Sequence, residues 1–414
     1  MNILYLAAAR ALNGSVSLLI VFVLSNYFTP TEYGRFGLIL STYMTISALC
    51  FFWLGAYLFR FHDIQKTRIS IVQLVLLSTF IMAMIVVGLW VFGFVWTLFD
   101  AAIIALGAIA LGGFSVVQEF LAGRQRYIFY FLTSCLRFIL AASIILVALL
   151  YLRDPMVVML AVIFAMLVPA MIIFGMFGGD AIFGERSHIG RIDCDQMMSI
   201  IRYSAPFVAI ALANASINVT DRVVIGHVLG LKSVGLYIGT QDLTIQIVGA
   251  AAGVLALRTA APSIRTFDAQ GFSADFCRAF LRRMVLASVG LLGLILLCLA
   301  LAPYTYLRLL SPEAQQVAGG FYVILTIGAG LFVYTNLVFH TVLMIQKRTH
   351  VMSIASLVVL IGNVVGNVVL VPHYGLSGAA ISLLLASTLG LVYSGFMTRH
   401  FWGGVFAATI GDKE

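Results

Sequence analysis

The sequence predicts an all-α, polytopic membrane protein with twelve transmembrane helices, and three observations support this fold class. Hydrophobic residues make up 62% of the 414 residues, whereas charged residues make up only 10%. Globular soluble chains carry about 25% charged residues, so lipid is the solvent that fits this composition. Apolar runs of roughly 20 residues, the length that crosses a bilayer as a helix, recur along the chain. Lysines and arginines gather in alternate loops between these runs.

Turn residues separate the apolar runs and set the approximate limits of each predicted helix. Examples are Thr29-Pro30, Arg153-Asp154-Pro155 and Ser311-Pro312. The first apolar stretch continues to Phe28 without a small-x-small cleavage site, so we interpret it as a retained helix and not as a signal peptide. The twelve predicted helices are 4–28, 36–59, 71–95, 101–121, 128–150, 156–178, 203–228, 234–257, 284–302, 318–342, 351–371 and 376–398.

The basic residues predict which loops face the cytoplasm. Loops after even-numbered helices, together with both ends of the chain, hold eighteen of the 24 lysines and arginines, and loops after odd-numbered helices hold four. This asymmetry places both ends of the chain in the cytoplasm. The net charge of +8 is therefore interpreted as a topology signal, and nucleic acid is not an expected partner.

A weak internal repeat predicts two six-helix lobes. Gly34 aligns with Gly235 at an offset of 201 residues, and the basic hairpins at 123–126 and 345–348 align at an offset of 222. An insertion of 21 residues in the second half accounts for the difference, and the loop 259–283 supplies it. Parallel repeats of this kind are typical of transporters. The predicted domains are an N-terminal lobe at 1–178, a cytoplasmic linker at 179–202 and a C-terminal lobe at 203–414.

The loop 259–283 contains a predicted amphipathic helix at Ser273–Arg283. Phe272, Phe276 and Phe280 recur every four residues on one face, and arginines at 278, 282 and 283 supply basic charge. This pattern is typical of a helix on the membrane surface. Two interpretations stay open, namely a linker held at the interface and a cytoplasmic gate or sensor of anionic lipid.

Ionisable residues inside predicted helices are the candidate site residues, because a charge at the bilayer centre costs about 3 kcal/mol on insertion scales. Arg137 lies nine residues into the fifth predicted helix, roughly 14 Å along it and near the midplane. It either faces a water-filled lumen with a functional role or pairs with a carboxylate. Arg10, seven residues into the first helix, either faces the lumen or reaches the cytoplasmic headgroups.

Asp221 and Arg222 are adjacent on the seventh predicted helix and point about 100° apart, so they do not simply neutralise each other. One interpretation has Arg222 at the interface with a partner on another helix, and the other has it facing the lumen. Asp242 and Glu119 are candidate counter-charges or coupling residues. Five asparagines, at 13, 214, 218, 363 and 367, either line the lumen or bind across helices.

The sequence contains no pattern typical of an enzyme or of a metal centre. It has no phosphate-binding P-loop, no zinc-spaced histidine and cysteine set and no nucleophile elbow. The five cysteines lack disulfide spacing, and we expect free thiols. The predicted outer loops are short except for 303–317, which disfavours a polytopic glycosyltransferase or polymerase.

Three motifs resemble the polysaccharide flippases of the multidrug/oligosaccharidyl-lipid/polysaccharide (MOP) exporter superfamily. Asp221–Tyr237, which begins with Asp-Arg and ends with Gly-Leu-Tyr, is similar to the start of the second half in that family. Pro30–Gly34 is similar to the corresponding part of the first half. Val371–Ala380 resembles the family's Pro-x-Tyr-Gly-x-x-Gly-Ala-Ala loop between the last two helices. The resemblance extends over the whole chain in the number and order of its helices.

The resemblance implies a Wzx-like flippase with a MATE-like, V-shaped fold. Such a protein moves undecaprenyl-diphosphate-linked oligosaccharide from the cytoplasmic to the outer leaflet of the bacterial inner membrane by alternating access. The product would feed the assembly of O-antigen, exopolysaccharide or capsule, with polysaccharide polymerase and glycosyltransferases as candidate partners. Arg137, Arg222 and Arg10 are then expected to bind the anionic headgroup, with Asp221 orienting or neutralising. No cofactor is expected, and a proton or sodium gradient is a candidate energy source.

Two other kinds of transporter and one non-transporting role are the alternatives. A multidrug-type cation antiporter of the same superfamily would need lumen carboxylates, for which Asp221, Asp242 and Glu119 are candidates. A major facilitator carrier would need its basic signature between the second and third helices, where residues 60–66 match poorly. A non-transporting component of a polysaccharide-synthesis complex leaves Arg137 unexplained. The small number of lumen arginines departs from the strongly cationic lipid II flippases.

Overall fold

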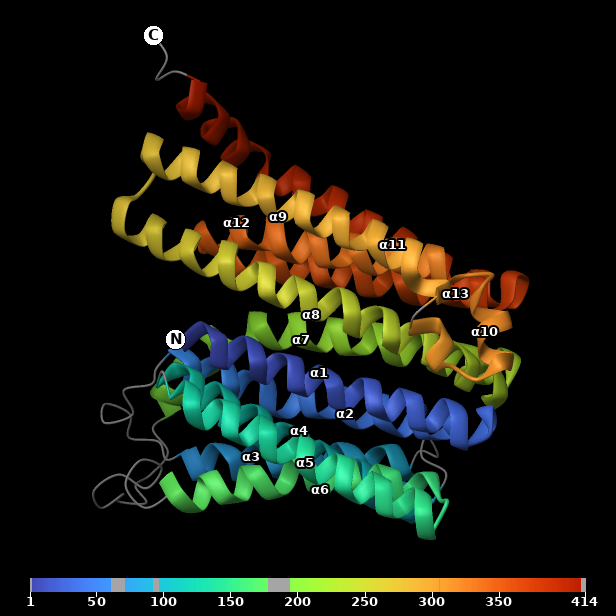
Figure 1. Cartoon of the computed structure of the whole chain (residues 1–414). Coiled ribbons are helices and arrows are strands. Elements are labelled where there is room, and N and C mark those ends of the chain that lie inside the picture. Colours follow the sequence, from blue (N-terminus) through green and yellow to red (C-terminus); the bar gives the residue numbers. More distant parts are fainter. Residues whose placement is uncertain are drawn as a thin grey trace. The chain divides into compact units, whose positions relative to one another are not determined.

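The computed structural model describes residues 2–60, 71–91, 97–124, 126–177, 194–304 and 306–410, and in these ranges all regular structure is helical (Figure 1). The prediction of an all-α chain is confirmed. The helices of the first half are α1 (Asn2–Tyr27), α2 (Pro30–Arg60), α3 (Ile71–Val91), α4 (Leu98–Gly123), α5 (Tyr127–Tyr151) and α6 (Pro155–Phe177). Those that follow are α7 (Cys194–Leu229), α8 (Leu231–Gln270), α9 (Ala274–Leu301), η3 (Ala302–Tyr304), η4 (Tyr306–Leu309), α10 (Pro312–Ala318), α11 (Tyr322–Tyr334), the π-helix η5 (Thr335–Phe339), α12 (His340–Ile345) and α13 (Thr349–Ile410).

The helices have the length and the surface of membrane-spanning segments. Within the described ranges, nine stretches are long and apolar enough to cross a membrane. Large apolar side chains remain exposed along them, and on α9 these are Val285, Leu286, Val289, Leu292, Leu296 and Leu297. Such a surface is stable against lipid and not against water. The chain is therefore a multi-pass membrane protein.

One boundary between predicted helices has a clear physical origin, and another differs from the prediction. The 62 residues of α13 contain Pro372 and Gly375, and Gly375 has φ 59° and ψ −137°, which is not helical. Glycine adopts this conformation without a Cβ penalty, so the chain breaks where the sequence predicts a loop between 371 and 376. At α7 the structure differs from the prediction, because the helix begins at Cys194 and not near residue 203. The predicted linker 179–202 therefore ends in helix, and its residues before 194 lie outside the described ones.

The helices form two compact units, and the hairpin between α1 and α2 belongs to the second unit. Unit 1 contains Met1–Ile20 and Arg35–Val219, and unit 2 contains Val21–Gly34 and Thr220–Glu414. The end of α1 and the start of α2 thus belong to the second unit, although the rest of both helices belongs to the first. In unit 1, α4 packs against α3, α5 and α6. In unit 2, α8 packs against α9 and α11, and α11 packs against α13.

The predicted helix at Ser273–Arg283 is confirmed, but the segment 259–283 is not a loop, contrary to the prediction. Helix α8 continues to Gln270, a short turn follows, and α9 begins after Ser273, whose side chain accepts a hydrogen bond from the Phe276 backbone N–H. Figure 1 shows α8 and α9 lying side by side along their length. Because α9 runs without a break from Ala274 to Leu301, its first turns are the end of a spanning helix.

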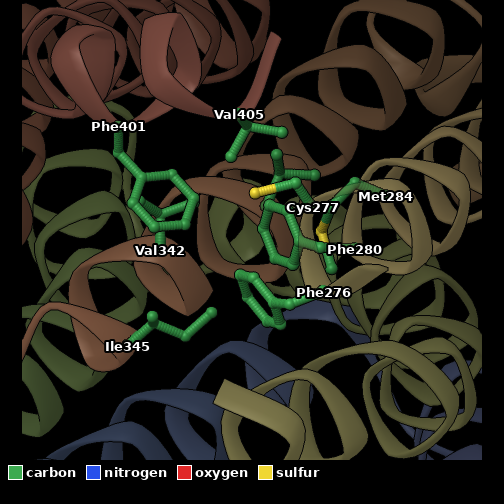
Figure 2. Close-up of a cluster of buried hydrophobic side chains, with 9 residues drawn as sticks. Phe276, Cys277, Phe280, Met284, Val342, Ile345, Phe401 and Val405 are labelled. Atoms are coloured by element: carbon green, nitrogen blue, oxygen red, sulfur yellow. The ribbon is translucent and has the colours of Figure 1, made fainter. Parts of the chain in front are cut away.

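Two of the three phenylalanines on the aromatic face of this segment are buried inside unit 2, whereas Phe272 is 48% exposed. Phe276 and Phe280 have no exposed surface and pack with Phe401 and Val405 of α13 and Val342 of α12 (Figure 2). The Phe276 and Phe280 rings stack at 5.6 Å between centroids, and Phe280 meets Phe401 edge to face at 5.6 Å. Phe276 and Phe280 thus face protein, because the ends of α12 and α13 supply an apolar surface that the sequence pattern alone does not reveal.

Replacing Phe280 by alanine is expected to lower the free energy of unfolding by about 3–5 kcal/mol, the usual effect of emptying a fully buried aromatic site. Thermal unfolding of the purified protein in detergent measures the loss. Leu286→Ala on the same helix is the matched control, since Leu286 is 61% exposed. Equal effects of the two substitutions would contradict the buried position of Phe280 and favour a surface helix.

Candidate functional site

Arg137 lies on α5 and contacts two other helices of unit 1. Its Nη1 donates a hydrogen bond to Oδ1 of Asn13 on α1, at 3.2 Å. Its guanidinium carbon lies 5.0 Å from the centroid of the Phe114 ring on α4, which is a cation–π distance. These contacts hold the arginine in place and leave its positive charge unneutralised.

Among the residues that the structure describes, no carboxylate lies within ion-pair distance of Arg137. Its Nε atom is buried and has no hydrogen-bond partner in that part of the chain, while the side chain as a whole is partly exposed. Of the two interpretations of Arg137, the structural pair with a carboxylate has no counterpart in the described helices. An unpaired guanidinium can form charge-assisted hydrogen bonds to an anionic group.

Polar side chains continue from Arg137 across three helices of unit 1. Asn13 donates from Nδ2 to the Ser134 hydroxyl of α5, at 3.3 Å. Gln118 of α4 donates from Nε2 to the Thr133 hydroxyl at 2.8 Å and to the Ser134 hydroxyl at 3.5 Å. The row ties α1, α4 and α5 together in a region where polar groups need internal partners.

Arg10 and Glu119 lie near each other at the exposed edge of this row. Both side chains are exposed. The charges of Arg10 and Glu119 act on each other, and Arg10 also hydrogen-bonds the Tyr130 side chain of α5. The structure therefore brings together Arg10 and Glu119, a predicted binding residue and a predicted counter-charge, in unit 1.

Asp221 is completely buried at the meeting point of three helices in unit 2. Its Oδ2 accepts hydrogen bonds from the Tyr237 hydroxyl at 3.1 Å and from Gln241 Nε2 at 3.0 Å, both on α8. Its Oδ1 accepts a hydrogen bond from Asn367 Nδ2 of α13 at 2.7 Å. Three donors satisfy this carboxylate inside the protein, so its local role is to join α7, α8 and α13.

Arg222 has its partner on the next helix. Its Nη2 forms an ion pair with Oδ1 of Asp242 on α8, at 2.5 Å. The Arg222 side chain is 3% exposed and that of Asp242 is 21% exposed. Asp221 and Arg222 thus turn to different partners, because adjacent residues on a helix point in different directions.

The predicted residues form two clusters, one in each unit. Arg10, Glu119 and Arg137 lie in unit 1, and Asp221, Arg222 and Asp242 lie in unit 2. The first cluster includes a cation without a carboxylate among the described residues. In the second, Arg222 pairs with Asp242, and three neutral donors hold the Asp221 carboxylate. The described part of the chain contains no group of three or more histidine, cysteine, aspartate or glutamate side chains that would hold a metal ion.

Several contributing residues are absent from the sequence prediction, although a signal for some of them exists. Tyr130, Thr133 and Arg137 recur at intervals of three and four residues, which marks one polar face on an otherwise apolar helix. Asn13 and Asn367, for which lumen and cross-helix positions stayed open, both bind across helices. Tyr237 and Gln241 have no comparable signal, since their partner Asp221 is on another helix.

Solved membrane transporters share this fold at low sequence identity. An inward-facing multidrug resistance MATE family transporter of the MOP superfamily is similar with TM-score 0.64 and 14% identity, covering 98% of this chain and 96% of its own. The lipid II flippase MurJ in an inward closed conformation is similar with TM-score 0.61 and 14% identity, covering 99% and 90%. The MATE multidrug transporter DinF-BH gives TM-score 0.65 and 12% identity, covering 97% and 94%.

A sequence family accounts for the larger part of the chain. A search of curated proteins finds no match. The family model described as Polysaccharide biosynthesis protein matches residues 1–257, which is more than half of the 414 residues. The chain therefore belongs to the polysaccharide biosynthesis protein family, and its fold is similar to that of MATE and MurJ transporters.

Proposed function

We propose that this protein moves an undecaprenyl-diphosphate-linked oligosaccharide from the cytoplasmic to the outer leaflet of the bacterial inner membrane. The product serves the assembly of O-antigen, exopolysaccharide or capsule, together with a polysaccharide polymerase and glycosyltransferases. The observation that carries the proposal is Arg137, a cation on a spanning helix with no carboxylate partner among the described residues, in a chain of the polysaccharide biosynthesis protein family.

The physical problem of this transport is the polar head of the lipid. A diphosphate and its sugars lose their hydration in hydrocarbon, and a buried charge without a partner costs several kcal/mol. An arginine held beside the path forms charge-assisted, bidentate hydrogen bonds to phosphate oxygens and lowers this cost. Asn13 and the Phe114 ring both contact the Arg137 guanidinium, and neither carries a negative charge that would neutralise it.

The proposed membrane arrangement has twelve helices in two six-helix lobes, at 1–178 and 203–414, with both ends of the chain in the cytoplasm. Nine spanning stretches, counted over the described residues, support it. Three further spans come from the shorter apolar helix Val75–Val91, from the break of α13 at Gly375, and from α8 with its 40 residues. The excess of basic residues in alternate loops supports the orientation.

The roles of the site residues follow from their partners. Arg137 and Arg10 bind the anionic headgroup, and Glu119 balances Arg10 before the substrate arrives. Arg222 is available to the headgroup only if its ion pair with Asp242 exchanges partners. Asp221 acts indirectly, since its three donors fix the position of α7 and with it the adjacent Arg222. The proposal includes no bound cofactor, and a proton or sodium gradient is the candidate energy source.

Replacing Arg137 by alanine is expected to reduce export of the surface glycan about 10- to 100-fold, the effect of losing one charge-assisted contact of about 1.5–3 kcal/mol. Arg137→Lys restores export only in part, because an ammonium group lacks the planar fork of the guanidinium. Labelling of newly exposed glycan on cells measures export, and immunoblotting of membranes measures insertion.

Arg399→Ala is the matched control for Arg137. Arg399 is an exposed arginine whose guanidinium lies 4.1 Å from the Phe396 centroid, so the substitution also removes a cation–π contact but touches no part of the proposed site. Normal export in the Arg137→Ala variant contradicts the proposed site. Unchanged glycan export together with loss of resistance to cationic drugs would favour the multidrug-type antiporter.

Replacing Asp221 by alanine is expected to lower the free energy of unfolding by about 3 kcal/mol, since it leaves buried donors on Tyr237, Gln241 and Asn367 without an acceptor. Export per folded molecule is expected to fall less than in the Arg137→Ala variant. Thermal unfolding in detergent and export normalised to folded protein separate the two effects. An Asp221→Ala protein with normal stability and no export would show instead that Asp221 contacts the substrate.

A further inference from the structure

The side-chain amide of Asn13 lies between Arg137 and a hydroxyl group of α5, and all three groups belong to unit 1. Its Oδ1 accepts a hydrogen bond from Arg137 Nη1 at 3.2 Å, and its Nδ2 donates to the Ser134 hydroxyl at 3.3 Å. An amide has one end that accepts and one end that donates, and a half-turn exchanges them. The end that faces Arg137 decides whether the amide attracts the guanidinium or repels it.

The backbone carbonyl of Tyr130 determines what the hydroxyl groups of α5 offer to the amide. The Thr133 hydroxyl donates to this carbonyl at 2.8 Å, and the Ser134 hydroxyl donates to it at 3.1 Å. A hydroxyl group has a single proton, so both oxygens are left as acceptors. Asn13 must therefore turn its NH2 group toward Ser134, and its oxygen points the other way.

Gln118 of α4 shows the same restriction on a second amide. Its Nε2 donates to the Thr133 hydroxyl at 2.8 Å, whereas its Oε1 is buried and has no hydrogen-bond partner in the part of the chain that the structure describes. A buried acceptor without a donor costs about 1–3 kcal/mol. A half-turn of the amide does not relieve this cost, because the Tyr130 carbonyl already accepts the neighbouring hydroxyl protons. The row therefore holds both amides in one orientation, at a cost in stability.

The guanidinium of Arg137 favours the same orientation of Asn13 from the other side. An arginine has five N–H donors and no acceptor, so an NH2 group turned toward it would repel it. The observed orientation presents the negative end of the amide dipole, which binds the guanidinium but carries no net charge. A carboxylate in the same place would pair with the arginine and compete with an anionic ligand. A neutral acceptor holds the arginine and leaves its charge available.

We propose that Asn13 is the positioning residue of the anion site, and that the hydroxyl groups of Thr133 and Ser134 fix the direction of its amide. Asn13 holds the Nη1 side of Arg137, and other N–H groups of the guanidinium bind the phosphate oxygens of the lipid head. Asn13 acts through Arg137 and does not contact the diphosphate. This inference rests on the proposed function, which supplies the anion.

The first test compares Asn13→Asp with Asn13→Ala by glycan export, normalised to folded protein in the membrane. Aspartate keeps a contact between α1 and α5 but neutralises Arg137, whereas alanine removes the contact and leaves the charge free. Export is expected to fall about tenfold with aspartate and roughly two- to threefold with alanine. If Asn13 only joined the two helices, alanine would be the more damaging substitution, and that order would overturn the proposal.

Ser15→Ala is the matched control on α1. The Ser15 hydroxyl donates to the Ala11 carbonyl of its own helix at 2.9 Å, so the substitution removes a bond within α1 near Asn13. Export is expected to stay unchanged. Ser134→Ala removes the acceptor that fixes the Asn13 amide and is expected to lower export per folded molecule roughly threefold. Export equal to that of the wild type in Ser134→Ala would overturn the role of the hydroxyl groups.

The second test measures Arg137 itself in the purified protein, by its rate of labelling with phenylglyoxal and mass spectrometry of the peptides. Phenylglyoxal attacks the deprotonated guanidine, and a neighbouring carboxylate holds the group protonated. Labelling of Arg137 is expected to be about tenfold slower in Asn13→Asp than in the wild type. Arg153, exposed just after the end of α5, is the internal control and is expected to react equally in both proteins. An equal rate at Arg137 would overturn the proposal.

Inorganic pyrophosphate separates the positioning role of Asn13 from the proposed function, because it supplies the diphosphate without lipid or sugar. It is expected to protect Arg137 of the wild type from phenylglyoxal. If it gives no protection and Arg137→Ala exports normally, while Asn13→Asp still slows the labelling, Asn13 positions Arg137 and the proposed anion site is wrong. If Arg137→Ala stops export while Asn13→Asp exports as well as the wild type, the site stands and the role of Asn13 is wrong.

Discussion

The cost of bringing a charged or polar group into hydrocarbon is the constraint on which this structure depends. Helices satisfy their own backbone groups, but each polar side chain on them needs a partner from another helix. Asp221 obtains three donors from α8 and α13, and Arg222 obtains Asp242. Apolar side chains do not specify which helices pair, because leucine packs as well against lipid as against protein. The hydrogen bonds and the ion pair do specify it.

The two units meet this constraint in different ways. In unit 2 every buried charge has a partner inside the protein, since Arg222 pairs with Asp242 and neutral donors hold Asp221, and this makes the cluster a structural joint. In unit 1 the Arg137 charge is held by an amide oxygen and an aromatic ring, neither of which carries an opposite charge. Under the proposed function, Arg137 of unit 1 is the residue available to an anionic headgroup, whereas Arg222 of unit 2 is held by Asp242.

Much of the fold is accessible from local sequence, because length, hydropathy and turn residues act along the chain. The helical class, the break near Gly375 and the candidate charges on spanning helices follow from these signals. At 259–283 the predicted helix is confirmed, but the predicted loop is wrong, and so is the assignment of Phe276 and Phe280 to a membrane-facing surface. Phe276 and Phe280 instead face Phe401, a residue more than 100 positions away, and no local pattern indicates that contact.

The sequence by itself determined the apolar helices, the charges that they carry and the relation between Gly34 and Gly235, since these depend on residue type and spacing. Only the tertiary structure decided the partners of those charges. It placed Asp242 against Arg222, left Arg137 without a carboxylate among the described residues, and brought the two repeat glycines into contact. The physical reason is that a side chain's charge is a property of the residue, whereas its neutralisation depends on which other helix packs beside it.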